Sequence, residues 1–111
     1  MPKYSNPDGI TYSDETVRRF ARMKTAADDF MIMWDNAYAV HDLHPEHRDT
    51  LINILDECKK AGDPNRVMIF ASTSKITYAG AGIAVFVCAQ EVMERMKKLL
   101  TIPTIGLDKM K

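Results

Sequence analysis

Residues 66–72 read RVMIFAS, an apolar run of strand length, and Lys75 follows within the polar stretch STSK at residues 72–75. The apolar run predicts a buried strand. Lysine is rarely buried in proteins unless its ammonium group is paired or takes part in a reaction. The position of Lys75 just beyond a buried strand therefore allows two interpretations, a solvated loop residue or a chemically active amine.

Two further apolar runs predict strands on either side of this one. FMIMWD at residues 30–35 has no polar alternation, which is typical of a parallel strand covered on both faces. AGIAVFVCA at residues 81–89 predicts another strand. The chain is therefore expected to contain a small sheet.

Helical patterns separate the predicted strands. A first helix is predicted from an N-cap at Ser13 to about Ala26, and a second from Pro45 to a stop at Gly62. The apolar face of the second helix consists of Leu51, Ile54, Leu55 and Cys58. A last helix carries Val92, Met93, Met96 and Leu99. An irregular tail is expected over residues 101–111.

This order of elements predicts an α/β fold with right-handed crossovers. We expect a partial three-layer sandwich around a mostly parallel sheet, in one domain over residues 1–111 with no second domain. Ligands of such open sheets bind beyond the carboxyl ends of the strands. Asp35 and Lys75 follow two of these ends, and Asn6 precedes the first helix, where another strand could end. These three polar residues are therefore expected at one edge of the sheet.

Composition narrows the class of protein. Fifteen basic residues balance fifteen acidic ones, so charge gives no reason to expect a nucleic acid or an anionic membrane as partner. The longest apolar stretch is too short and too rich in glycine for a membrane span, and the first residues lack the apolar core of a signal peptide. Cys58 and Cys88 lie in apolar patterns, which is typical of buried free thiols in a cytoplasmic protein.

Three short motifs occur in a specific order. SNPDG at residues 5–9, WDNAY at residues 34–38 and STSK at residues 72–75 match the patterns N-P-x-G, D-x-A-Y and S-x-S-K. In this order they resemble the core of a fold-type I pyridoxal-phosphate aminotransferase of class I/II. The longer stretches DNAYAVH and STSKITYAGAG resemble the aspartate aminotransferase-like subgroup. By this resemblance the chain is the central part of the large, cofactor-binding domain.

The resemblance implies a role for each matching residue. Lys75 would form the aldimine with pyridoxal 5'-phosphate and then move the proton from the substrate Cα. Asp35 would pair with the pyridine nitrogen and keep it protonated, which makes the ring an electron sink. Tyr38 and Asn6 would hydrogen-bond the ring 3′ oxygen. Ser72 and Ser74 would donate hydrogen bonds to the phosphate.

The resemblance implies the transfer of an amino group between an amino acid and a 2-oxo acid, with aspartate as one candidate for the amino acid. It also implies a homo-oligomer, such as a dimer. Family enzymes are several times longer, so 111 residues are not expected to turn over substrate alone. The upstream phosphate turn and the downstream arginine that binds the substrate carboxylate have no counterpart here. Ile83 also stands where the family often has a phosphate-binding arginine.

Other interpretations of these residues stay open. The chain could be a truncated, non-catalytic remnant that acts as an oligomerising or interaction module, or an unrelated α/β binding domain with accidental motifs. His41, His44 and His47 have the spacing H-x-x-H-x-x-H, but without a cysteine ligand and with an intervening proline we expect no metal site. His41 lies near the cofactor motif and has no role assigned by the sequence.

Overall fold

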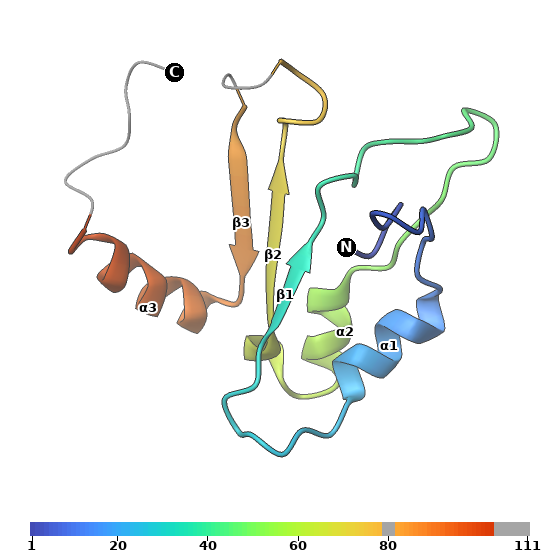
Figure 1. Ribbon diagram of the computed structural model, residues 1–111. Coiled ribbons are helices and arrows are strands. Elements are labelled where there is room, and N and C mark those ends of the chain that lie inside the picture. Colours follow the sequence, from blue (N-terminus) through green and yellow to red (C-terminus); the bar gives the residue numbers. More distant parts are fainter. Residues whose placement is uncertain (79–81, 104–111) are drawn as a thin grey trace.

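The computed structural model describes residues 1–78 and 82–103, and these residues form an α/β fold, as predicted (Figure 1). In chain order the elements are α1 (Asp14–Arg22), β1 (Ile32–Asp35), α2 (Ile54–Lys60), the short 3-10 helix η1 (Pro64–Arg66), β2 (Val67–Ser72), β3 (Ala84–Cys88) and α3 (Gln90–Leu100). The predicted tail lies mostly outside the described residues, because placement ends at residue 103.

The sheet is mixed and has the strand order β1-β2-β3. β1 is parallel to β2, with Ile32 opposite Val67 and Asp35 opposite Phe70. β3 is antiparallel to β2. The parallel arrangement expected from the sequence therefore holds for β1 and β2 but not for β3. The physical reason is the connection over residues 73–83, which is shorter than the crossover of a dozen or more residues that parallel strands need.

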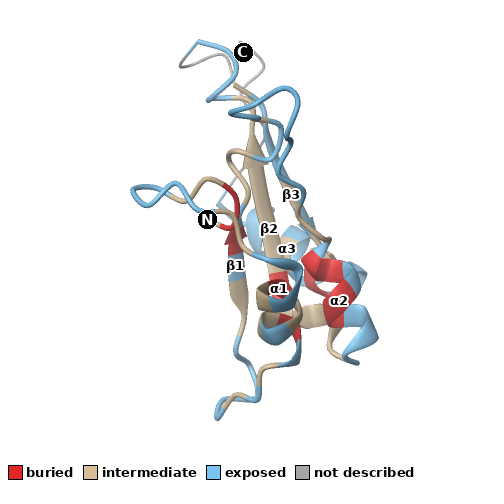
Figure 2. Cartoon of the chain, turned by 90° about the vertical axis from the view of Figure 1, so that its right-hand side faces the viewer, coloured by how far each residue is buried: buried red, intermediate tan, exposed pale blue. Residues whose placement is uncertain are grey.

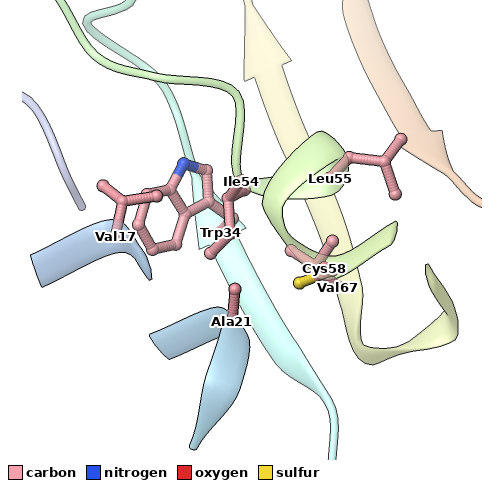
Figure 3. Packing of buried hydrophobic residues seen from close by; sticks show 7 residues of the cluster. All are labelled: Val17, Ala21, Trp34, Ile54, Leu55, Cys58 and Val67. Carbon is pink, nitrogen blue, oxygen red and sulfur yellow. The ribbon is translucent and has the colours of Figure 1, made fainter. Parts of the chain in front are cut away.

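The core lies between β1 and β2 and the two helices that cover one face of the sheet (Figure 3). Trp34 from β1 and Val67 from β2 point toward α1 and α2. The complete cluster is Val17, Ala21, Trp34, Ile54, Leu55, Cys58 and Val67. Tyr12 and Phe20 surround Trp34 with ring centroids 6.0 and 6.1 Å away. The last helix, α3, follows β3 and buries only Val92.

Helix α1 starts as predicted and ends earlier than predicted. The Ser13 hydroxyl accepts a hydrogen bond from the Thr16 amide at 3.2 Å, which is the expected N-cap. The helix stops at Arg22, short of Ala26. Arg66 explains this end, because its guanidinium donates to the carbonyls of Ala21 and Met23 and so satisfies backbone groups that a longer helix would have paired.

Helix α2 begins at Ile54, so the predicted start at Pro45 is wrong. The Asn53 side chain accepts a hydrogen bond from the Leu55 amide at 3.0 Å and provides a better cap than the proline. Leu51 still packs against the core from the segment before the helix. The stop at Gly62 is confirmed, because this glycine has φ +85° and its amide bonds the Lys59 carbonyl.

Burial divides the molecule into two parts (Figure 2). Buried residues concentrate on α1, α2 and the adjoining parts of β1 and β2, whereas the loops beyond the carboxyl ends of β1 and β2 are mostly exposed or half-buried. None of the helices in the described residues is long and apolar enough to cross a membrane. The exposed loops contain the residues that the sequence motifs single out.

Candidate functional site

Asp35 and Ser72 lie on one face of the sheet, at the carboxyl ends of β1 and β2. Asp35 stands opposite Phe70 in the parallel register, and Ser72 follows two residues later on the same face. Both residues line a hollow of about 260 Å³ that also contains Phe70 and Phe86, whose ring centroids are 5.3 Å apart. The hollow therefore combines an aromatic surface with a carboxylate and a hydroxyl.

The Asp35 carboxylate is held by its own loop. Its Oδ1 accepts a hydrogen bond from the Ala37 amide at 3.1 Å. Within residues 1–78 and 82–103, Oδ2 has no hydrogen-bond donor and no cation within ion-pair distance. The Asn36 amide donates to the Phe70 carbonyl at 2.7 Å, which extends the pairing of β1 and β2 beyond Asp35. The bond to Oδ1 therefore orients the carboxylate, and Oδ2 can accept a hydrogen bond from an external donor.

Lys75 lies on a single helical turn directly after β2. The amides of Ile76 and Thr77 both donate to the Thr73 carbonyl at 2.9 Å. Thr73 also pairs with Ile83 through two contacts, its amide with the Ile83 carbonyl and its hydroxyl with the Ile83 amide, each at 2.9 Å. The turn is thereby joined to the start of β3, and the Lys75 side chain is exposed on it.

Gly82 explains part of the glycine-containing segment after Lys75. A Cβ on Gly82 would lie 2.7 Å from the Ser74 hydroxyl oxygen, closer than such contacts occur. The absence of a side chain therefore allows Ser74 to approach the chain at the base of β3. Ile83 stands where the family often has a phosphate-binding arginine. Its backbone hydrogen-bonds Thr73, and the residue is 70% exposed.

Tyr38 and the Lys75 turn are connected through His41. The rings of Tyr38 and His41 meet edge to face, with centroids 5.3 Å apart and planes at 87°. His41 Nε2 lies 3.1 Å from the Lys75 carbonyl oxygen. His41 therefore contacts the ring of Tyr38 and the backbone of Lys75, which belong to two separate motifs.

Asn6 lies in an exposed turn near the N-terminus, closed by a hydrogen bond from the Gly9 amide to the Ser5 carbonyl. The turn is tied to the loop after β1 by Lys3, which is 5% exposed. The Lys3 ammonium lies 3.0 Å from Asp42 Oδ1 and donates to the Ala39 carbonyl at 3.3 Å. Within the described residues no hydrogen bond joins Asn6 itself to Asp35, Tyr38 or Lys75.

Three buried side-chain polar atoms have no partner within the described residues, and they flank the motif residues. They are Ser5 Oγ, Asn36 Oδ1 and His41 Nδ1. Ser5 precedes Asn6, Asn36 follows Asp35, and His41 contacts Tyr38. Because buried polar atoms are almost always hydrogen-bonded in proteins, these three atoms are exceptions within the described residues.

Sequence patterns do not identify Lys3 or Gly82 as part of this region. Lys3 acts on Asp42, which is 39 positions away, and no local pattern indicates such a pair. Gly82 is visible in the sequence only as one of several glycines. The position of His41 within the stretch DNAYAVH indicates that it lies near the motif residues. Its partner, the backbone carbonyl of Lys75, cannot be predicted from residue types.

Comparison with known proteins matches the whole chain. The family model described as aspartate amino-transferase covers residues 1–111. A protein of Mycolicibacterium smegmatis named as an aminotransferase is 47% identical over 109 residues, which are 98% of this chain and 25% of the relative. An aspartate aminotransferase of Corynebacterium glutamicum is 47% identical over 91 residues, 82% of this chain and 21% of that protein.

Solved structures agree with this result. A crystal structure described as an aminotransferase from Corynebacterium diphtheriae matches with a TM-score of 0.90 and 42% identity, over 97% of this chain and 26% of the other. An aspartate transaminase from Corynebacterium glutamicum matches with a TM-score of 0.89 and 42% identity, over 97% and 25%. The chain therefore spans about a quarter of the length of the proteins that it resembles.

Proposed function

Because the chain belongs to the aspartate amino-transferase family, to which all 111 residues match, we propose that it is part of the large domain that binds pyridoxal 5'-phosphate in a transaminase. The reaction is transfer of an amino group between an amino acid, with aspartate as the first candidate, and a 2-oxo acid. Residues 1–111 are all assigned to this domain. The observation that carries the proposal is the hollow at the carboxyl ends of β1 and β2, which Asp35 and Ser72 line beside Phe70 and Phe86.

The residues present fit this cofactor. Its phosphate needs several hydrogen-bond donors, its ring needs an apolar surface and its ring nitrogen needs an anionic partner. The hollow beside Asp35 contains a carboxylate with one free oxygen, two phenylalanine rings and the Ser72 hydroxyl. The exposed turn that follows adds the Ser74 hydroxyl and the Lys75 amine.

Each residue has a chemical task in this proposal. Asp35 accepts a hydrogen bond from the ring nitrogen and so keeps a proton there. Ser72 and Ser74 donate to the phosphate, and Tyr38 and Asn6 donate to the ring oxygen. When bound, pyridoxal phosphate supplies an aldehyde that condenses with amines and a ring that accepts electrons. Lys75 provides the amine and moves the proton at the substrate Cα.

The test uses pyridoxal 5'-phosphate with the 111-residue chain, followed by borohydride reduction and peptide mapping by mass spectrometry. We expect one dominant reduced adduct, on Lys75, and its loss in Lys75→Ala. Lys24→Ala is the matched control, because Lys24 is also exposed and lies outside the motifs. An adduct distributed evenly over the lysines, or the same yield in Lys75→Ala, would refute the proposed cofactor site.

A second candidate function is a non-catalytic module that self-associates. One observation favours it. Within the described residues β1 and β3 are both edge strands, and they carry the exposed apolar side chains of Met33, Val85 and Val87. Open edges with apolar residues invite association. Sedimentation analysis together with a transamination assay on aspartate and 2-oxoglutarate separates the two functions, because a stable oligomer that shows neither adduct nor turnover supports the module.

A further inference from the structure

His41 lies in the loop after β1 and connects Tyr38 of that loop to the turn after β2. Its ring edge meets Tyr38, and its Nε2 reaches the Lys75 carbonyl at 3.1 Å. Tyr38 and Lys75 lie in different motifs, and any ligand held by both needs them at a constant separation. His41 provides such a connection, because its amide donates to the Tyr38 carbonyl at 3.1 Å and its ring reaches the Lys75 carbonyl.

The contacts of His41 determine which ring nitrogen carries the proton. A carbonyl oxygen only accepts hydrogen bonds, so Nε2 must be the donor to Lys75. Nδ1 is buried and has no partner within residues 1–78 and 82–103. With the proton on Nε2, Nδ1 retains only a lone pair, and an unsatisfied acceptor is more readily tolerated in proteins than an unsatisfied N–H. The geometry therefore assigns the Nε2–H tautomer.

In the described residues, the start of the Lys75 turn is anchored on the chain before β3. Thr73 holds the start of the turn through its contacts with Ile83, and its carbonyl accepts from Ile76 and Thr77. His41 is the hydrogen-bond partner of the Lys75 carbonyl in the described residues, so this bond limits rotation of the peptide that carries the lysine.

We propose that His41 is a positioning residue, which holds the Lys75 turn in register with Tyr38 by donating from Nε2 to the Lys75 carbonyl. The proposal rests on the proposed function, because the register matters for a ligand that contacts both residues. Misplacement of a reacting group by about 1 Å can reduce a rate by about a hundredfold. The aldehyde of pyridoxal phosphate is the ligand class that this register serves.

Two substitutions separate the donor from the ring. His41→Phe keeps an aromatic edge against Tyr38 and removes the donor, whereas His41→Gln removes the ring and keeps an N–H donor near the Nε2 position. His44→Phe is the matched control, because His44 lies on the same loop, is exposed and has no side-chain hydrogen bond to residues 73–78. Circular dichroism establishes that each variant is folded.

The first readout needs no cofactor. Nitrogen-15 NMR of the unaltered chain should show His41 with the proton on Nε2. Hydrogen exchange of the Ile76 and Thr77 amides should accelerate about tenfold in His41→Phe and stay within about threefold of the unaltered chain in His41→Gln and His44→Phe. A proton on Nδ1, or unchanged exchange in His41→Phe, would overturn the proposal. Should His41→Phe fail to fold, the tautomer and the His41→Gln exchange rates decide.

The second readout is the rate at which pyridoxal phosphate is trapped on Lys75 by reduction. We expect about a tenfold decrease in His41→Phe and recovery in His41→Gln. Equal rates in all variants would contradict the positioning role. If the unaltered chain forms no adduct on Lys75, the proposed function fails, while the exchange measurement still decides whether His41 fixes the turn.

Discussion

The part of the sheet covered by α1 and α2 and the loops beyond the ends of β1 and β2 are stabilised in different ways. The covered part buries a cluster of seven apolar side chains that includes Trp34, and its charged groups pair within or between neighbouring elements. The loops depend on single long-range contacts such as Lys3 with Asp42 and His41 with Lys75, and the loop after β1 retains two buried polar atoms, Asn36 Oδ1 and His41 Nδ1, that have no partner within the described residues. This difference indicates that folding free energy is concentrated in the first region, whereas the proposed ligand chemistry belongs to the second.

The largest expected change in stability comes from a substitution in the covered region. Trp34→Ala should lower the free energy of unfolding by about 3–5 kcal/mol, because Trp34 is 5% exposed and fills the space between Tyr12, Phe20 and the helices. Urea unfolding measures the change. Met33→Ala on the same strand is the control and should cost less than about 0.5 kcal/mol, since Met33 is 71% exposed. Equal losses would mean that the two faces of β1 are not distinguished by burial.

The next effect concerns the end of α1. Arg66→Met should reduce stability by about 1–3 kcal/mol, because the carbonyls of Ala21 and Met23 would lose their charged donor. Thermal unfolding followed by circular dichroism provides the measurement. Arg95→Met is a suitable comparison, because Arg95 is an exposed arginine on α3. A loss no larger than that of Arg95→Met would show that the helix end does not need Arg66.

A smaller effect depends on pH. The hydrogen bond from Lys60, at 2.6 Å, together with the charges of Lys60 and Arg18, holds the pKa of Glu57 below its ordinary value of 4.5. A carboxyl whose pKa is lower in the folded state stabilises the protein above its unfolded pKa, and this contribution is lost as the pH falls through the folded pKa. Glu57→Gln should therefore reduce the difference in stability between pH 7 and about pH 3.5. Identical pH profiles of stability for the unaltered chain and Glu57→Gln would contradict a role for the pair of Glu57 and Lys60.

The covered region should also protect its thiol. Burial raises the pKa of Cys58 to about 11. At pH 8 the thiolate fraction of Cys58 is thus about a hundredfold lower than that of a thiol with the ordinary value of 9.0, and alkylation by iodoacetamide should be slower by at least this factor until urea unfolds the chain. Rapid alkylation in the folded chain would mean that the core around α2 opens readily.

The smallest expected change in stability comes from the loops. Lys75→Ala and Asp35→Asn should alter the free energy of unfolding by no more than about 0.5 kcal/mol, because both side chains are exposed and make few contacts within the chain. The same substitutions should abolish or weaken the trapping of pyridoxal phosphate. A large destabilisation without an effect on trapping would reverse the assignment of the two regions.

Sequence patterns predict much of this architecture. Unbroken apolar runs predict β1, β2 and β3, and the Ser13 cap and Gly62 stop predict the ends of two helices. The errors have tertiary causes. Pro45 is a local signal for a helix start, but the helix that packs against the core begins later and is capped by Asn53. Helix α1 ends where Arg66, which is distant in sequence, donates hydrogen bonds to its carbonyls.

The sequence by itself determined the α/β class and the order of the three motifs, because both follow from local periodicity and from residue types at short spacing. The position of Asp35 and Ser72 at neighbouring strand ends was also predictable, since the carboxyl ends of parallel strands meet at one edge. Only the tertiary structure decided the direction of β3, the anchoring of Lys3 on Asp42 and the contact of His41 with the Lys75 carbonyl. These features join residues that are distant in sequence, and such contacts exist only once the chain has folded back on itself.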